Sequence, residues 1–189
     1  MTIQHENEKV KWYIMHSYKN EARAEKMLAD NGEIEYFIPK EPVIRIRHGE
    51  KRIEMVPVIS SLIFLHASQK DIVNFKKNIY NDLQFMTRKG QDGIVRYLTV
   101  RDKEMANFLL MYNQSDKKIT YMRPEEINIT KGQRVKIHGG AMDTMEGLFV
   151  KVAHKRSRQI VVIIPDVFAA SVEVEPQFIE VLNNTASSM

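Results

Sequence analysis

The chain has 189 residues, of which 43% are apolar, and this share excludes a wholly disordered chain because it is enough for a packed core. It contains no cysteine, which excludes disulfides and thiolate metal sites and suits a reducing compartment. The net charge of +4 permits contact with nucleic acid without requiring it. No apolar stretch approaches the roughly 20 residues that span a bilayer, and the polar N-terminus predicts no signal peptide, so we expect a cytoplasmic protein.

The first 112 residues mix short strands with amphipathic helices. In chain order, we expect a strand at residues 12–18, a helix at 20–32, a strand at 35–39, a hairpin at 43–55, a strand at 57–67, a helix at 68–80, a hairpin at 83–98 and a helix at 99–112. His48-Gly49 is the expected turn of the first hairpin. Ser68 is the expected N-cap of the second helix, and Thr99 and Asp102 have the spacing of a capping box. This order predicts an α+β domain, an antiparallel sheet with helices packed on it, over residues 10–112.

The remaining residues follow a different pattern. Residues 113–125 are polar, contain Arg123-Pro124 and show little periodicity, so we interpret them as a linker. Beyond them the helical pattern vanishes, and short strands are expected at residues 133–138, 147–154, 159–165, 171–175 and 178–182. Because closure removes sheet edges, these strands predict a small all-β barrel domain over residues 126–182.

Three of the chain's eight glycines lie in one stretch between the first two strands of the expected barrel. Gly139 and Gly140 end one strand, and Gly147 begins the next. Glycine in a strand costs roughly 0.5–1 kcal/mol relative to alanine, so it marks a corner or a close approach of two backbones. The alternative is an ordinary glycine-rich loop, and the spacing fits no phosphate-binding motif.

The stretch "KGQRVKIHGGAMDTMEGLFVKV" resembles a KOW motif, a strand–loop–strand unit with glycines before and after the loop. In the first half, "WYIMHSYKNEARAEKML" and "FIPKEPVIRIRHGEKRIEMVPVISSLIFL" resemble the NusG N-terminal (NGN) domain. The chain is thus similar, over about residues 10–182, to NusG-type transcription elongation factors, above all to the RfaH-like and UpxY-like antiterminators. The resemblance implies an NGN domain followed by an SH3-like KOW barrel. Ser60-Ser61-Leu62 stands where that family usually has a Pro-Gly-Tyr turn.

The resemblance implies that the first domain binds the clamp helices of RNA polymerase through an apolar patch. The matching positions are His16, Tyr18 and Ile59. Exposed aromatic and aliphatic side chains gain free energy by burial at an interface. The alternative is that Tyr18 and Ile59 belong to the core.

In specialised relatives the first domain also contacts the non-template DNA strand. The positions that this resemblance implies are cationic: Lys19, Arg23 and Lys26 on the first helix, with Arg88 and Lys89 on the second hairpin. Cations bind phosphates in a salt-dependent manner. The alternative is a solvated helix face with local ion pairs.

For the KOW domain the resemblance implies a partner, either ribosomal protein S10 or the termination factor Rho. Phe168 falls on the aromatic position that the family presents to such partners. The basic run Lys151, Lys155, Arg156 and Arg158 is typical of a charged hairpin tip, with RNA contact as the alternative. Some relatives refold this domain between helix and barrel, but the β-branched "QIVVIIP" favours a constant barrel.

We find no catalytic or metal-binding pattern. The six histidines are scattered without ligand spacing, and no serine or threonine lies in a nucleophile context, so we expect neither an enzyme nor a cofactor or metal. The expected function is to bind polymerase and promote processive transcription of particular operons, with surface-polysaccharide operons suggested by the UpxY resemblance. The alternative is an RNA-binding or ribosome-associated KOW protein. We find no heptad stripe and expect a monomer.

Overall fold

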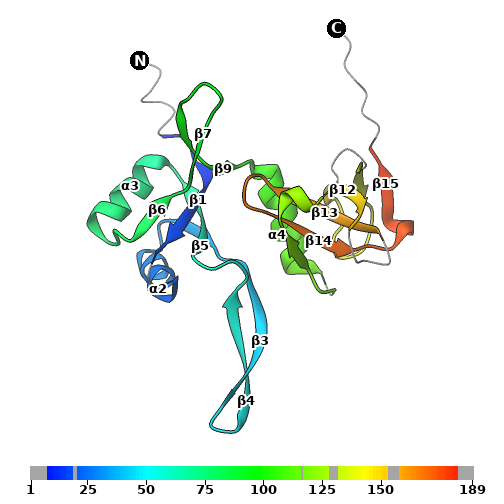
Figure 1. The fold of residues 1–189 in the computed structure, drawn as a ribbon, viewed down its shortest axis with the longest axis horizontal. Helices are drawn as coiled ribbons and strands as arrows, with labels where there is room; N and C mark the ends of the chain where they lie inside the picture. Colours follow the sequence, from blue (N-terminus) through cyan, green and yellow to red (C-terminus); the bar gives the residue numbers. More distant parts are fainter. Residues whose placement is uncertain (1–7, 19–20, 116, 128–131, 153–157, 183–189) are drawn as a thin grey trace. The chain divides into compact units, whose positions relative to one another are not determined.

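The computed structural model describes residues 8–18, 21–115, 117–127, 132–152 and 158–182, and Figure 1 shows their elements. The chain forms two compact units, Met1–Arg101 and Asp102–Met189. This boundary lies before the helix that the sequence assigned to the first domain. Within the described residues, no helix is both long and apolar enough to cross a membrane.

An antiparallel five-stranded sheet forms the centre of the first unit. Its neighbouring strands, in spatial order, are β2 (Glu35–Phe37), β5 (Leu62–Ala67), β1 (Lys11–Ser17) and β6 (Leu83–Phe85), and β9 (Thr99–Val100) also pairs with β1. The central strands β1 and β5 are rich in aromatic and β-branched residues, which suit a pleated, buried surface. Their side chains are almost all buried. β5 covers only the second half of the strand expected at residues 57–67, because Pro57 ends the preceding strand, β4 (Glu50–Pro57), and residues 58–61 form a turn.

Two amphipathic helices, α2 (Glu21–Asn31) and α3 (Gln69–Asn78), share a core with one face of this sheet. The helices contribute Ala24, Leu28, Ile72 and Phe75; the central strands contribute Tyr13, Met15, Ile63 and Leu65. The predicted cap of α3 is confirmed, because the backbone amide of Asp71 donates to Ser68 Oγ at 3.1 Å. Both predicted helices are therefore present, although Ile79, expected to face inward from the second of them, follows the end of α3 and is 48% exposed.

Two hairpins extend the first unit beyond its sheet (Figure 1). The longer one pairs β3 (Lys40–Arg47) with β4 (Glu50–Pro57), and the shorter pairs β7 (Thr87–Lys89) with β8 (Val95–Tyr97). His48 and Gly49 both have positive φ, 54° and 82°, as a two-residue hairpin turn requires. Both predicted hairpins are confirmed.

A six-stranded antiparallel sheet organises the second unit. Its strands, in spatial order, are β10 (Thr120–Met122), β14 (Phe168–Glu173), β13 (Arg158–Ile164), β12 (Glu146–Lys151), β11 (Gln133–Ile137) and β15 (Ile179–Val181). Short 3-10 turns, η1 (Pro124–Glu126) and η3 (Pro176–Phe178), precede β11 and β15. The sheet confirms a β-rich second part, whereas its closure into a barrel stays a prediction.

The segment preceding this sheet differs from the sequence-based prediction. Helix α4 (Asp102–Gln114) contacts β13 and is part of the second unit rather than the first. Residues 113–125 are not a plain linker, because they include β10, which pairs with the edge of β14. Thr99 is not a helix cap; it lies in β9, opposite Tyr13. β10 has only three residues, too few to show the alternation typical of a strand, so it can be recognised only from its pairing with β14.

Three glycines of the second unit, Gly139, Gly140 and Gly147, occupy positions that a larger residue would strain. Gly139 and Gly140 have φ values of 80° and 72°, in the left-handed region that favours glycine. Gly147 lies in β12, where a Cβ atom would come 2.7 Å from the carbonyl oxygen of Val161 in β13. The glycines therefore serve a tight turn and a close strand approach, as expected, rather than an ordinary loop.

Candidate functional site

The end of β1 and the turn before β5 form one exposed corner of the first unit. The backbone amide of Ser17 donates to the carbonyl oxygen of Ser61 at 2.9 Å, and the amide of Leu62 donates to Ile59 at 3.4 Å. Ser61 has a φ of 66°, the left-handed conformation that glycine adopts most readily. The chain therefore makes the bend with Ser61, at the position where the NusG-type proteins that it resembles usually have glycine.

This corner brings together the three residues proposed to bind polymerase. Tyr18 is 70% exposed, which excludes the alternative that it is a core residue. Its ring stacks on the half-buried His16, with centroids 5.9 Å apart and planes at 28°. Ile59 is half-buried in the adjoining turn. We name His16, Tyr18 and Ile59 the corner patch, since it combines an exposed ring with aliphatic surface.

Glu21, in the first turn of α2, holds this corner in place. The hydroxyl of Ser60 donates to Glu21 Oε1 at 3.2 Å, and the backbone amide of Ser61 donates to the same oxygen. A carboxylate that accepts bonds from a turn fixes the turn's conformation. In the sequence Glu21 has no visible role beyond that of an acidic residue near the positive end of a helix, because its partners are 39 and 40 residues away along the chain.

The proposed DNA-binding cations lie in two separate places. Arg23 and Lys26 are exposed on α2, and Arg23 lies 5.8 Å from the centroid of the Tyr80 ring. Arg88 and Lys89 are exposed on β7, which Figure 1 places well away from α2. The structure therefore does not gather all these cations into a single surface. Lys19 lies outside the described residues.

The local ion pairs considered for α2 are not the ones that form. Glu25 binds Lys40, at the base of the β3–β4 hairpin, with Nζ–Oε2 at 2.6 Å. Glu21 is engaged by the turn at Ser60 and Ser61. Thus the two glutamates of the first turns of α2 tie the helix to neighbouring elements rather than pair along its own face.

The β7–β8 hairpin combines cations with an aromatic stack. Tyr97 stacks on Phe85 with centroids 4.2 Å apart, and Lys76 Nζ lies 5.3 Å from the Phe85 centroid. Partial burial lowers the pKa of Lys76. The Arg96 guanidinium beside Asp92 holds the pKa of that carboxyl below its usual range. Charged and stacked groups of this kind suit contact with a nucleic-acid strand.

An apolar face on the β3–β4 hairpin was not recognised from the sequence as a surface. Cross-strand pairing puts Ile44 opposite Ile53, and both are exposed, as are Ile46 and Met55. The other face carries Arg45, whose Nε lies 3.3 Å from Glu54 Oε2. Alternation predicted the hairpin, but alternation alone does not show whether the apolar face is covered.

Phe168, proposed to face a partner of the second unit, is buried at 2% exposure. Its ring meets Phe108 of α4 edge-to-face, with centroids 5.1 Å apart, and Tyr121 of β10 at 5.6 Å. The expectation that this aromatic is displayed is therefore not met in this structure. The sequence could not show this, because Phe108 was assigned to the other domain.

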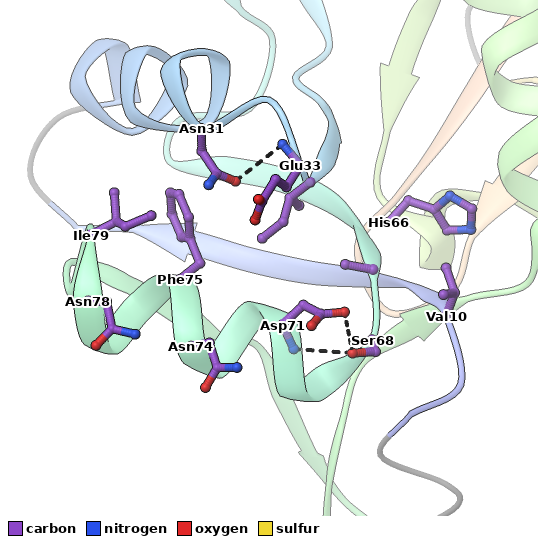
Figure 2. A pocket seen from close by; sticks show the side chains of 12 residues that line it. Val10, Asn31, Glu33, His66, Ser68, Asp71, Asn74, Phe75, Asn78 and Ile79 are labelled. Atoms are coloured by element: carbon purple, nitrogen blue, oxygen red, sulfur yellow. Dashed lines mark hydrogen bonds between the residues drawn. The ribbon is translucent and has the colours of Figure 1, made fainter.

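A pocket of about 420 Å³ lies between the end of α2, the end of β5 and α3 (Figure 2). Three of its polar side chains already serve the fold: Ser68 and Asp71 cap α3, and His66 Nδ1 lies 2.7 Å from Glu35 Oε2. Among the described residues, no three histidine or acidic side chains gather as metal ligands. We interpret this pocket as a gap between packed elements.

The chain is related to known transcription factors. A family model described as transcription termination factor nusG matches residues 10–131. The transcription termination/antitermination protein NusG of Borreliella burgdorferi is 26% identical over 184 residues, covering 88% of this chain and 95% of that protein. The matched region includes the corner patch and both groups of cations. The chain therefore belongs to the NusG family of transcription termination and antitermination factors.

Proposed function

We propose that the protein binds the clamp helices of RNA polymerase through the corner patch and makes transcription more processive, by binding rather than catalysis. The observation that carries this proposal is the 70% exposure of Tyr18 on a rigidly held corner. Covering a large, water-exposed aromatic ring with a partner lowers the free energy of the complex. Because Glu21 fixes the adjoining turn, the patch is preorganised and loses little conformational entropy on binding.

We further propose a specialised role, as an antiterminator for particular operons, surface-polysaccharide operons among them. Such selectivity needs a surface that reads DNA, and two groups of cations are available for it: Arg23 and Lys26 on α2, or Arg88 and Lys89 on β7. Within the second group, Lys89 is supported by the exposed, stacked Tyr97, because the strand register puts both on the same face of the β7–β8 hairpin. Cations provide affinity, whereas stacking bases on an aromatic ring positions a single strand.

For the second unit we propose an SH3-like KOW barrel that recruits a further protein, ribosomal protein S10 or Rho, through the face around Phe168. The antiparallel sheet β10–β15 and the glycine-dependent corners support a small closed barrel. The burial of Phe168 means that this partner reaches the face only after a change in the contacts of α4.

Polymerase capture by the intact chain tests the central proposal. Tyr18→Asp and Ile59→Asp should each weaken the capture of purified RNA polymerase, because they place a charge in the proposed interface. Val73→Asp is the matched control, since Val73 is an exposed apolar residue of α3 that is not in the corner patch. The proposal fails if the wild type captures no polymerase at physiological salt, or if the three variants behave alike.

A further inference from the structure

Two arginines lie directly opposite each other in the β7–β8 hairpin, which extends beyond the sheet of the first unit (Figure 1). The strand register pairs Arg88 with Arg96, so both side chains project from the same face of the hairpin, and both are exposed. The Cβ atoms of such a pair are about 4.5–5.5 Å apart, and like charges at this spacing destabilise the pairing. The arginine pair is therefore unfavourable for the fold unless an anion lies beside it.

The turn of the hairpin supplies one such anion, the carboxylate of Asp92. Arg96 Nη1 donates to Asp92 Oδ1 at 3.0 Å, and Arg96 Nη2 donates to the other oxygen, Oδ2. The backbone amide of Ile94 donates to Oδ1 at 3.0 Å, so the turn itself holds the carboxylate in position. Arginine binds phosphate with the same geometry, two parallel bonds from two nitrogens to two oxygens. Asp92 thus takes the place on Arg96 that a phosphate group would take.

One carboxylate does not balance the cations around it. Between Thr87 and Tyr97 the chain has three basic side chains, on Arg88, Lys89 and Arg96, against the single acidic side chain of Asp92. The side chains of Arg96 and Asp92 are 57% and 46% exposed, and ion pairs in contact with water contribute little to stability. An incoming anion can therefore replace Asp92 at small cost.

We propose that Arg88 and Arg96 form a binding site for one phosphate group of the non-template DNA strand, and that Asp92 occupies Arg96 as an internal competitor until this phosphate displaces it. The inference rests on the DNA-reading role proposed for the hairpin and adds Arg96 and Asp92 to that role. The site does not distinguish bases, because every nucleotide carries the same phosphate. The competitor weakens binding to free nucleic acid, whereas a strand held beside the hairpin has a high effective concentration and displaces it.

The test measures binding of the intact chain to a fluorescent oligothymidylate at several salt concentrations. Asp92→Asn keeps an acceptor oxygen for the Ile94 amide but removes the charge that binds Arg96. It should tighten binding about three- to fivefold, the size expected when an exposed ion pair no longer competes. The dependence of log K on log salt should become steeper by about 0.7, for one more phosphate neutralised. Asp82→Asn is the matched control, since it removes an exposed carboxylate of the first unit outside the hairpin and should leave that slope unchanged.

A second background separates the proposed site from a general effect of charge. In Arg96→Gln the guanidinium that Asp92 occupies is absent, so adding Asp92→Asn should give little or no further gain. Hydrogen-exchange protection of the Ile94 amide shows whether the turn is intact in each variant. An equal gain in both backgrounds would reflect net charge alone and would overturn the inference, as would an intact Asp92→Asn variant that binds no better than the wild type.

Two comparisons distinguish the remaining outcomes. Oligouridylate of the same length should show the same gain in Asp92→Asn, because the site contacts only phosphate; a gain confined to RNA would contradict the assignment to DNA. If charge reversal at Arg88 and Lys89 weakens DNA binding while Asp92→Asn has no effect, the hairpin still contacts DNA and only the inference about Asp92 fails. If neither change alters binding, the DNA-reading role proposed for the hairpin fails as well.

Discussion

Gly147 of β12 lies so close to Val161 of β13 that a Cβ atom would come 2.7 Å from the Val161 carbonyl oxygen. It would also come 2.8 Å from Ile160 Cγ1, and both neighbours are buried. Gly147→Ala should therefore force β12 and β13 apart and lower the free energy of unfolding of the second unit by about 1–3 kcal/mol. Hydrogen exchange of β12 and β13, together with thermal unfolding, measures this loss.

Gly90→Ala is an informative control for that substitution. A Cβ atom at Gly90 would come 2.5 Å from Asp92 Oδ1 and 2.6 Å from Arg96 Nη1, which is nominally a closer contact. Both of those atoms lie at the ends of exposed side chains that can move away. We expect a change of less than about 0.5 kcal/mol, as for most surface substitutions. Equal losses at the two glycines would contradict the interpretation that backbone proximity is what β12 requires.

Ser61→Gly should stabilise the first unit. A left-handed conformation costs a residue with a Cβ atom about 1–2 kcal/mol, of which the greater freedom of unfolded glycine cancels about 0.5–1 kcal/mol. The net gain should be about 0.5–1 kcal/mol. Trp12, the only tryptophan, is buried in β1 and reports the transition in a urea titration followed by fluorescence.

Ser60→Gly should have the opposite sign. Ser60 does not have a positive φ, and its hydroxyl donates to Glu21 at 3.2 Å, so glycine removes a hydrogen bond without relieving any strain. The expected loss is about 0.5–1.5 kcal/mol. If both substitutions stabilise the protein, the strain assigned to Ser61 is not local to that residue.

The two groups of cations can be distinguished by the salt dependence of binding to single-stranded DNA. Reversing the charge of Arg88 and Lys89 should weaken binding and reduce the dependence of log K on log salt by about 0.7 for each phosphate that is no longer neutralised. The same reversal at Arg23 and Lys26 should leave that slope unchanged if the aromatic stack at Tyr97 marks the binding face. A smaller slope only in the α2 variant would assign the DNA contact to the helix instead.

Acid should loosen the β7–β8 hairpin. The folded-state pKa of Asp92 is depressed, chiefly by its bond to Arg96, so its contribution to stability is present above the ordinary value of 3.8 and is lost as the pH falls through the folded pKa. The amide of Ile94 donates to Asp92 Oδ1 at 3.0 Å, and its hydrogen-exchange protection should fall over the same range. Asp92→Asn keeps an acceptor oxygen but does not titrate, so its protection at Ile94 should not change with pH there.

Local patterns predicted much of this fold correctly. The His48-Gly49 turn and the cap at Ser68 each depend on residues close together in the sequence, and each is confirmed, as is the second half of the strand before Ser68. The corner patch was also found from local matches to the family, although its exposure came only from the structure. Tyr18 directly follows a buried strand, so the sequence allowed either a core or a surface position.

The features that the sequence missed depend on distant partners. Glu21 has the appearance of an ordinary helix-start residue, and its role at Ser60 and Ser61 requires the sheet to be assembled. Helix α4 has one apolar stripe, which could be buried against any neighbouring apolar surface. Its periodicity therefore could not assign the helix to the second unit. Phe168 was expected to be exposed because of its match to a family position, and the ring that covers it, Phe108, lies 60 residues earlier in the chain, where no local pattern reveals the contact.

The pairing of β10 with β14 also bears on how the protein can be divided for experiments. A fragment cut at residue 126, where the sequence places the start of the second domain, would lack β10 and leave the backbone of Ala169, Ala170 and Ser171 without its neighbour. Bare strand edges recruit other chains, so such a fragment would be prone to self-association. In fragments that retain Thr120–Met122, β10 covers this edge of β14, so we expect less self-association.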